Sequence, residues 1–287
     1  MEKLAIIVDS SSNIVNGQFK HVYMMPLIIT ETKDGNYKEY KDIVDINLND
    51  ISNKLLNGDV LKTSQSSLGD NVKLIEDLLQ KYEKVVVFTL NKKLSNNFEN
   101  WNLLASEYEG RVFNIANSMM AEYQIWTIQD LYPKLLDQTL TVEEIEEYMI
   151  EANKKRLVAL IVPDLKFLIR GGRIKKIAGA VATLLNFKIV ISLDTDGLNF
   201  YGKVIKTSQL PGKIKELFDE KIDFEHKKVK RVCFASSEFH DKKYDFEGLK
   251  EDLMKYFGFK DVGKATMPGV VMVHTGPNYF AVGIEIE

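Results

Sequence analysis

The sequence predicts an α/β protein made of two α/β domains. Short apolar, β-branched runs alternate with amphipathic helical patterns in the first half of the chain, which is typical of a parallel sheet flanked by helices. After about residue 188 the pattern changes to a hairpin and mixed strand connections. The length of 287 residues suffices for two domains. We therefore expect a mainly parallel first domain at 1–157 and a second domain with a mixed sheet at 158–287.

The first half contains apolar runs that indicate strands. They do not alternate apolar with polar residues, which favours strands covered by helices on both faces. These strands are expected at 4–12, 84–90, 111–115 and 157–163. The helices of this part, which carry apolar residues at helical spacing, are expected at 70–82, 98–109, 118–136 and 142–155.

The second half begins with a short helix from Pro163 to Gly171, because proline favours the first turn of a helix and glycine its end. Two strands then surround the turn Asp194–Gly197, a pattern typical of a hairpin. The remaining helices are expected at 208–224 and 246–257, and the remaining strands at 230–236, 270–276 and 279–286.

Composition excludes several classes of function. Apolar residues make up 45% and charged residues 28%, with a net charge of −3, so the chain is globular and lacks the basic balance of a nucleic-acid binder. Cys233 is the only cysteine, which excludes an intramolecular disulfide and a cysteine metal cluster, and its strand setting favours a core residue over a nucleophile. No apolar run approaches the roughly 18 residues of a membrane-spanning helix. The N-terminus lacks the pattern of a secretion signal, so we expect a cytoplasmic protein.

Polar clusters follow two of the expected strands, at the strand ends where open parallel sheets bind ligands, and a third cluster precedes an expected helix. Val8–Ile14 reads VDSSSNI, Thr63–Ser67 reads TSQSS, and Asn91–Asn97 reads NKKLSNN. Such side chains can simply cap backbone groups, as Ser66 or Ser67 would at the start of a helix. A run of hydroxyls can also hold an anion or a carboxylate by hydrogen bonds. Both interpretations stay open.

Two further stretches lie in the second half. His274 and Thr275 end an apolar run, where a lone histidine is more often structural than catalytic unless Thr63 lies close to it. The stretch Arg170–Arg173 reads RGGR and lacks the spacing of a phosphate-binding loop. An apolar helical face follows, accompanied by small residues, and it fits either core packing or close approach of a thin ligand. It comprises Ile174, Ile177, Ala178, Val181, Leu184 and Leu185.

Taken together, these stretches resemble the DegV family of bacterial fatty-acid-binding proteins. That family includes FakB subunits, which carry a fatty acid for a FakA-type kinase. The matching motifs occur in the family's order over nearly the whole chain. They are Asp9-Ser10, Thr63-Ser64-Gln65, Leu94-Ser95, Leu168 through Ile174, and His274 through Pro277.

The resemblance implies a lipid carrier rather than an enzyme, with no catalytic residue, no cofactor and no metal. It implies a long-chain fatty acid in a cleft between the two domains, and a FakA-type kinase that phosphorylates the carboxylate for phospholipid synthesis. Transient contact with a membrane surface fits this role, and nucleic acid does not. The implied carboxylate-binding residues are Thr63, Ser64, Asn91, Lys92, His274 and Thr275. The apolar face from Ile174 to Leu185 would line the acyl chain, and Arg170, Gly171, Gly172 and Arg173 would meet the kinase.

The chain departs from the family pattern on one wall of the implied site. Asn91 and Lys92 replace paired serines, Ala116 replaces an aspartate, and Tyr123 replaces a glycine. Either Asn91 or Lys92 supplies the lost contact and a fatty acid still binds, or the pocket has changed to another lipid or apolar acid. An acyl- or phosphoryl-transfer enzyme that uses His274 as acid and base is a separate alternative. A binding or sensor module for a non-lipid ligand is a third.

Overall fold

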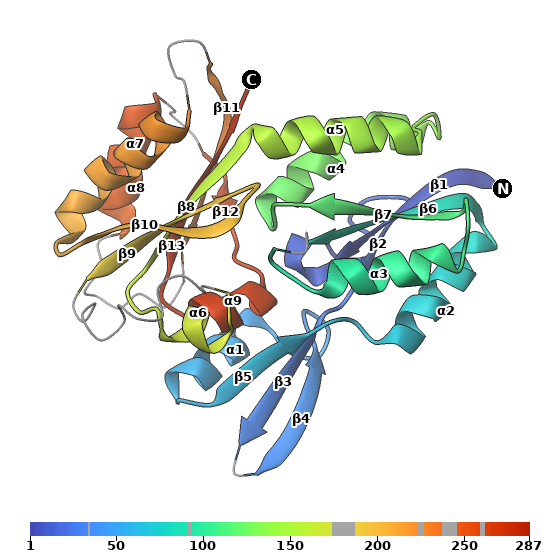
Figure 1. Ribbon diagram of the computed structural model, residues 1–287, viewed down its shortest axis with the longest axis horizontal. Helices are drawn as coiled ribbons and strands as arrows, with labels where there is room; N and C mark the ends of the chain where they lie inside the picture. The colour runs from blue at the N-terminus through green and yellow to red at the C-terminus, as the bar shows by residue number, and fades with distance from the viewer. Residues whose placement is uncertain (34, 91–92, 174–186, 223–226, 237–245, 259–261) are drawn as a thin grey trace. The chain divides into compact units, whose positions relative to one another are not determined.

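The computed structural model describes residues 1–33, 35–90, 93–173, 187–222, 227–236, 246–258 and 262–287 (Figure 1). These residues form two compact units. Unit 1 comprises Met1–Asn153 with Pro268–Val270, and unit 2 comprises Lys154–Met267 with Val271–Glu287. The division falls just before strand β8 (Arg156–Val162), whereas the boundary expected at 157/158 lies inside that strand.

Unit 1 contains the predicted parallel sheet, with two differences. The strand at 22–25 was not predicted, and the strand expected at 157–163 is β8 of unit 2, which pairs antiparallel with its neighbours. The strands of the parallel sheet are ordered β2-β1-β6-β7, and every neighbouring pair is parallel. The inner residues of β1 and β6 are buried on both faces, which explains their uninterrupted apolar sequences. The strands are β1 (Glu2–Asp9), β2 (Val22–Met25), β6 (Tyr82–Leu90) and β7 (Val112–Asn117).

Helices cover both faces of this sheet, as the sequence predicts (Figure 1). One face packs against α2 and α3 through Ile75, Leu78 and Trp101. The other face packs against α4 and α5 through residues such as Ile128 and Ile145. The helices are α2 (Leu68–Leu79), α3 (Asn97–Ser106), α4 (Glu122–Leu136) and α5 (Val142–Lys154).

Unit 1 also contains a small antiparallel sheet that the sequence analysis missed. Its order is β4-β3-β5, with β3 (Ile28–Lys33), β4 (Asn36–Lys41) and β5 (Val60–Ser64). Helix α1 (Leu48–Leu56) lies between β4 and β5 in the chain and starts with a capping box formed by Asn47 and Asp50. Most of β4 is exposed and carries alternating charges, so no apolar run marks it as a strand.

Unit 2 is built on the predicted mixed sheet. The strand order is β10-β9-β8-β13-β11-β12, in which β11 and β12 are parallel and the other neighbours antiparallel. Helices α7 and α8 pack on it through Leu217, Phe218 and Leu253 (Figure 1). The remaining elements are α6 (Lys166–Arg170), β9 (Lys188–Asp194), β10 (Gly197–Val204), α7 (Leu210–Lys221), β11 (Val229–Ser236), α8 (Phe246–Phe257), β12 (Lys264–Ala265) and β13 (Phe280–Ile286).

The prediction of a strand at 270–276 is wrong, because this segment is helix α9 (Gly269–Thr275). A short apolar run that is buried nearly all round has no periodicity that separates a helix from a strand. Pro268 precedes the helix, and Gly276 ends it with φ +86 while its N–H donates to the Met272 carbonyl at 2.8 Å. His274 therefore lies in the last turn of a helix and not at a strand end.

Candidate functional site

The polar cluster after β1 forms a buried network in unit 1. β1 ends at Asp9, which caps a short 3-10 turn at Ser10–Ser12 by accepting from the Ser11 N–H at 2.9 Å. The Ser11 hydroxyl also donates to Asp9 and accepts from Gln124 Nε2 at 3.3 Å. Ser10 Oγ donates to Asp42 Oδ2 at 2.8 Å. The serines after β1 are thus bound to carboxylates and backbone groups of their own unit.

Both carboxylates of this network are buried, with exposed fractions of 4% for Asp9 and 1% for Asp42. Burial raises the pKa of the Asp9 carboxyl to about 6, against the lowering effect of its hydrogen bonds from Ser11. Burial likewise raises the pKa of Asp42 to about 6, although Ser10 and backbone N–H groups stabilise its ionised form. Within the described residues, Asp9 Oδ2 has no hydrogen-bond partner. The ionised form of Asp9 is therefore costly to bury.

We expect Asp9→Asn to stabilise unit 1 at neutral pH by roughly 1–3 kcal/mol. A carboxyl whose pKa is higher in the folded chain than in the unfolded chain binds more protons when folded, so its contribution to stability grows as pH falls from about 7 towards 4. The asparagine variant should lose part of that dependence. Urea unfolding at several pH values measures the effect, with Asp77→Asn, at an exposed position of α2, as the matched control. A variant that is less stable at neutral pH and keeps the full pH dependence would contradict this account of Asp9.

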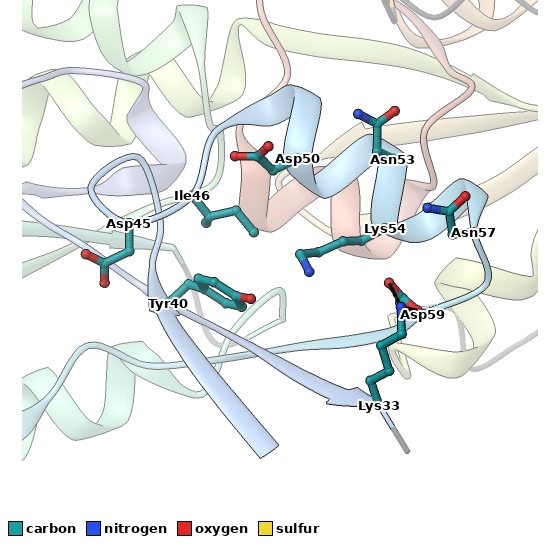
Figure 2. A pocket seen from close by; sticks show the side chains of 9 residues that line it. All are labelled: Lys33, Tyr40, Asp45, Ile46, Asp50, Asn53, Lys54, Asn57 and Asp59. Atoms are coloured by element: carbon teal, nitrogen blue, oxygen red, sulfur yellow. Dashed lines mark hydrogen bonds and ion pairs between the residues drawn. The ribbon is translucent and has the colours of Figure 1, made fainter. Parts of the chain in front are cut away.

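The small sheet and α1 enclose a pocket of about 390 Å³ in unit 1 (Figure 2). Tyr40 and Ile46 are its buried residues, and charged and amide side chains surround them. Asp45 and Asp50 lie on the side opposite Asp59 (Figure 2). The lining includes neither Thr63 nor Ser64. Ligand pockets for apolar molecules are lined mainly by hydrophobic side chains, so this polar pocket does not suit an acyl chain.

A partly buried ion pair joins α1 to β3 beside this pocket. Lys54 Nζ donates to Glu31 Oε1 at 2.6 Å, and the Tyr40 hydroxyl donates to Glu31 Oε2 at 2.7 Å. The hydrogen bond from Lys54 lowers the pKa of Glu31, and the same bond raises the pKa of Lys54. Both groups therefore remain ionised at neutral pH.

Replacing Lys54 with Met should destabilise unit 1 by about 1–3 kcal/mol, because it leaves the buried Glu31 without its cation. The matched control is Lys134→Met, which removes an exposed lysine paired with the exposed Glu144 at 2.6 Å. Exposed pairs contribute about 0–1 kcal/mol. Thermal and urea unfolding distinguish the two variants. Equal losses of stability in the two variants would show that the ion pair of Lys54 with Glu31 contributes no more than an exposed pair.

Thr63 and Ser64 end β5, next to Ile29 and Ile28 of β3. Thr63 is half-buried and Ser64 is exposed. Ser67 accepts from the Asp70 N–H at 3.4 Å and is the N-cap of α2, so one of the two serines proposed as a cap has that role. Tyr123 is buried on α4 and packs edge-on against Trp126, which places it in the core of unit 1.

In unit 2, α6 ends in a Schellman motif. The Gly172 N–H donates to the Ile169 carbonyl at 2.9 Å, and the Arg173 N–H donates to the Leu168 carbonyl at 3.0 Å. Gly172 has φ +69, the left-handed conformation that this motif places after the helix. Arg173 Nη1 then folds back and donates to the Gly171 carbonyl at 2.6 Å. The segment expected at the kinase surface is therefore a defined helix end.

His274 lies against this helix end. Burial, together with the smaller effect of the positive charge of Arg173, lowers the pKa of the imidazole to about 4. His274 is therefore neutral at physiological pH. Burial also lowers the pKa of the Arg173 guanidinium, which remains a cation because its ordinary pKa is so high. A neutral imidazole beside a half-buried cation can donate a hydrogen bond to an anion and supply its counter-charge.

The remaining predicted residues are placed as follows. Arg170 and Gly172 are exposed, whereas Arg173 is half-buried. Thr275 is buried, and its hydroxyl donates to the Val271 carbonyl of its own helix at 3.2 Å. Asn91, Lys92 and the predicted acyl-chain face from Ile174 to Leu185 lie outside the described residues. The structure thus brings His274 together with Gly171 and Arg173, while Thr63 belongs to the other unit.

No sequence pattern predicts a site role for Asp42 or Gln124. Asp42 meets Ser10 across 32 residues of chain, and no motif marks it. Among the described helices, none is long and apolar enough to cross a membrane. The described residues also contain no group of three or more histidine, cysteine or acidic side chains arranged to hold a metal ion.

Comparisons with known proteins agree on one family. The family described as "Uncharacterised protein, DegV family" matches residues 3–287. A DegV domain-containing protein of Clostridium acetobutylicum is 30% identical over 227 residues, which cover 76% of this chain and 77% of that protein. A fatty-acid-binding DegV family protein from Thermus thermophilus has a TM-score of 0.82 and 22% identity, with 99% of each chain covered. The Streptococcus pneumoniae fatty acid kinase B3 protein, loaded with linoleic acid, has a TM-score of 0.77 and 17% identity, with 99% of this chain and 100% of that chain covered. The chain therefore belongs to the DegV family.

Proposed function

We propose that this chain binds a long-chain fatty acid and presents its carboxylate, in the cytoplasm, to a FakA-type kinase. The observation that carries the proposal is that His274 of α9 packs against the end of α6 at Gly171, close enough to Arg173 for its charge to lower the pKa of the imidazole. A fatty acid at neutral pH has an anionic head and an apolar tail. The pair of His274 and Arg173 offers a hydrogen-bond donor and a cation to the head. The solved relatives described as fatty-acid-binding proteins support the choice of ligand.

The proposed headgroup chemistry follows from the low pKa of His274. A neutral imidazole donates one ring N–H without adding a second buried charge. Arg173 supplies the counter-charge, and a guanidinium is suited to a carboxylate because its N–H groups form a planar fork. Thr63, Ser64, Asn91, Lys92 and Thr275 remain the other residues proposed to contact the carboxylate.

The acyl chain is proposed to lie along the apolar face that the sequence predicts from Ile174 to Leu185. Each methylene that leaves water contributes roughly 0.8 kcal/mol, so a chain of more than a dozen methylenes supplies most of the binding free energy. The carboxylate contacts then set orientation and specificity rather than total affinity. Arg170 and Gly172 are exposed and are the residues of the RGGR segment accessible to a kinase, whereas Arg173 is better placed to serve the ligand.

A titration of the delipidated protein tests the proposal. Oleate should bind with one site per chain, and oleyl alcohol, which has the same tail without the carboxylate, should bind at least about ten-fold more weakly because it leaves His274 and Arg173 without their anion. Equal binding of oleate and its alcohol would place the carboxylate away from this pair. Binding of a shorter apolar acid in preference to oleate would favour the alternative ligand class.

A further inference from the structure

Two glycines end helix α6, and backbone geometry explains one of them. Gly172 has φ +69 and occupies the left-handed position of the Schellman motif. Gly171 precedes it with φ −75 and ψ −7, which is right-handed backbone that any L-residue adopts without strain. The reason for a glycine at 171 must therefore lie in the space beside its α-carbon.

That space is filled by the ring of His274. A Cβ added to Gly171 would overlap Nδ1 of the imidazole and lie 2.9 Å from Cε1 and 3.2 Å from Cγ. The ring is largely buried and belongs to a helix, so a methyl group at 171 fits only if the imidazole leaves its buried position. The imidazole thus occupies the volume that a side chain at 171 would need.

A second glycine repeats this packing in the opposite direction. A Cβ on Gly276, the residue after α9, would lie 2.5 Å and 2.7 Å from Cδ2 and Cε2 of Phe167 on α6. Each helix thus places an aromatic ring over a glycine of the other segment, His274 over Gly171 and Phe167 over Gly276. All four residues belong to unit 2. The two contacts together fix where the His274 ring lies relative to α6.

We propose that Gly171 is the positioning residue of His274, because its missing side chain lets the imidazole rest against the end of α6 beside Arg173. Gly171 also contacts the second polar group, since its carbonyl accepts from Arg173 Nη1. Gly171 therefore lies between the two groups of the headgroup pair. The packing of the His274 ring against Gly171 does not depend on the proposed function, whereas its consequence for lipid affinity rests on that function.

Gly171→Ala tests the inference through the ionisation of His274. In the native protein the imidazole is neutral at about pH 6, because its pKa is about 4. In the variant, the new methyl group should displace the imidazole into solvent, so its pKa should return towards the ordinary value of 6.5. A larger fraction of the ring should then be protonated at the same pH. A pH titration of histidine-labelled protein, followed by NMR, measures the pKa of His274. The chain has 4 histidines, and the signal missing from the spectrum of His274→Ala is that of His274. An unchanged His274 signal in a folded Gly171→Ala variant would overturn the inference.

A double-mutant cycle covers the case in which Gly171→Ala folds poorly. In the His274→Ala background the ring is gone, so Gly171→Ala should lose most of its destabilising effect on thermal unfolding. The same loss in both backgrounds would overturn the positioning role. Gly212→Ala on α7 is the matched control, because a Cβ there meets nothing within 4 Å, and it should leave the His274 signal unchanged.

Lipid binding separates this inference from the proposed function. Gly171→Ala should lower oleate affinity about ten-fold, comparable to the loss of one hydrogen bond to a charged group. If the native protein binds no fatty acid, the proposed function fails, and the NMR and unfolding cycle still decide the role of Gly171. If the native protein binds oleate and the variant binds it equally while the His274 signal moves, the imidazole does not serve the carboxylate.

Discussion

His274→Ala should weaken oleate binding by at least about ten-fold, because the carboxylate loses a hydrogen bond to a charged acceptor in a largely buried place. The variant should still take up lipid at high concentration, since the methylenes supply most of the free energy. Isothermal titration with delipidated protein measures the change. The loss should be small for oleyl alcohol, which has no carboxylate to accept the bond.

The control for this prediction is Val273→Ala, which removes buried apolar atoms from the neighbouring position of α9. It should lower the unfolding temperature without discriminating between oleate and its alcohol. Because the pKa of His274 is about 4, the imidazole stays neutral throughout the range from about pH 6 to pH 8. We therefore expect the affinity of the native protein for oleate to change little over this range. An affinity that falls steeply above the ordinary pKa of histidine would show that the cationic imidazole is the binding form.

Arg173→Met should weaken oleate binding about ten- to a hundred-fold, more than His274→Ala does. The reason is that it leaves a carboxylate in a poorly hydrated site without a counter-charge. Methionine preserves much of the apolar stem, so packing changes little. The variant should also raise the pKa of His274, since Arg173 contributes to its lowering, but not to the ordinary value, because burial is the larger cause. Parallel titrations with oleate and NMR of His274 measure both effects.

Lys166→Met, which removes an exposed cation from the same helix α6, should leave oleate binding unchanged. Arg173→Lys should recover part of the affinity, because the charge returns without the planar fork. If Arg173→Met binds oleate normally and fails only in acyl-phosphate formation with a kinase, Arg173 belongs to the docking surface that the family resemblance implies.

The sequence predicts the fold well where burial controls it. Strands β1 and β6 of the parallel sheet in unit 1 are buried on both faces, so their apolar runs are long and unbroken. β4 carries charged residues at an exposed sheet edge, so the small sheet has no comparable signal. Helix α9 is misassigned for the opposite reason, because a segment buried nearly all round shows no period at all.

The sequence indicates which motifs contribute to the candidate site, but not how their side chains lie relative to one another. The sequence places His274, Arg173 and the glycine pair among the site residues. It explains Gly171 as the end of a helix, whereas only Gly172 has the left-handed conformation typical of that position. The packing of Gly171 against His274 and the Asp42 contact with Ser10 join residues far apart in the chain. Such contacts arise from tertiary packing and leave no local pattern.

The central claim is that this chain carries one long-chain fatty acid whose carboxylate lies at His274 and Arg173. Native mass spectrometry of the purified protein, followed by lipid extraction, tests it most directly. We predict a stoichiometric mass increment that matches a long-chain fatty acid and that diminishes in His274→Ala and Arg173→Met. A native protein that carries no lipid and takes up neither oleate nor palmitate after delipidation would contradict the claim.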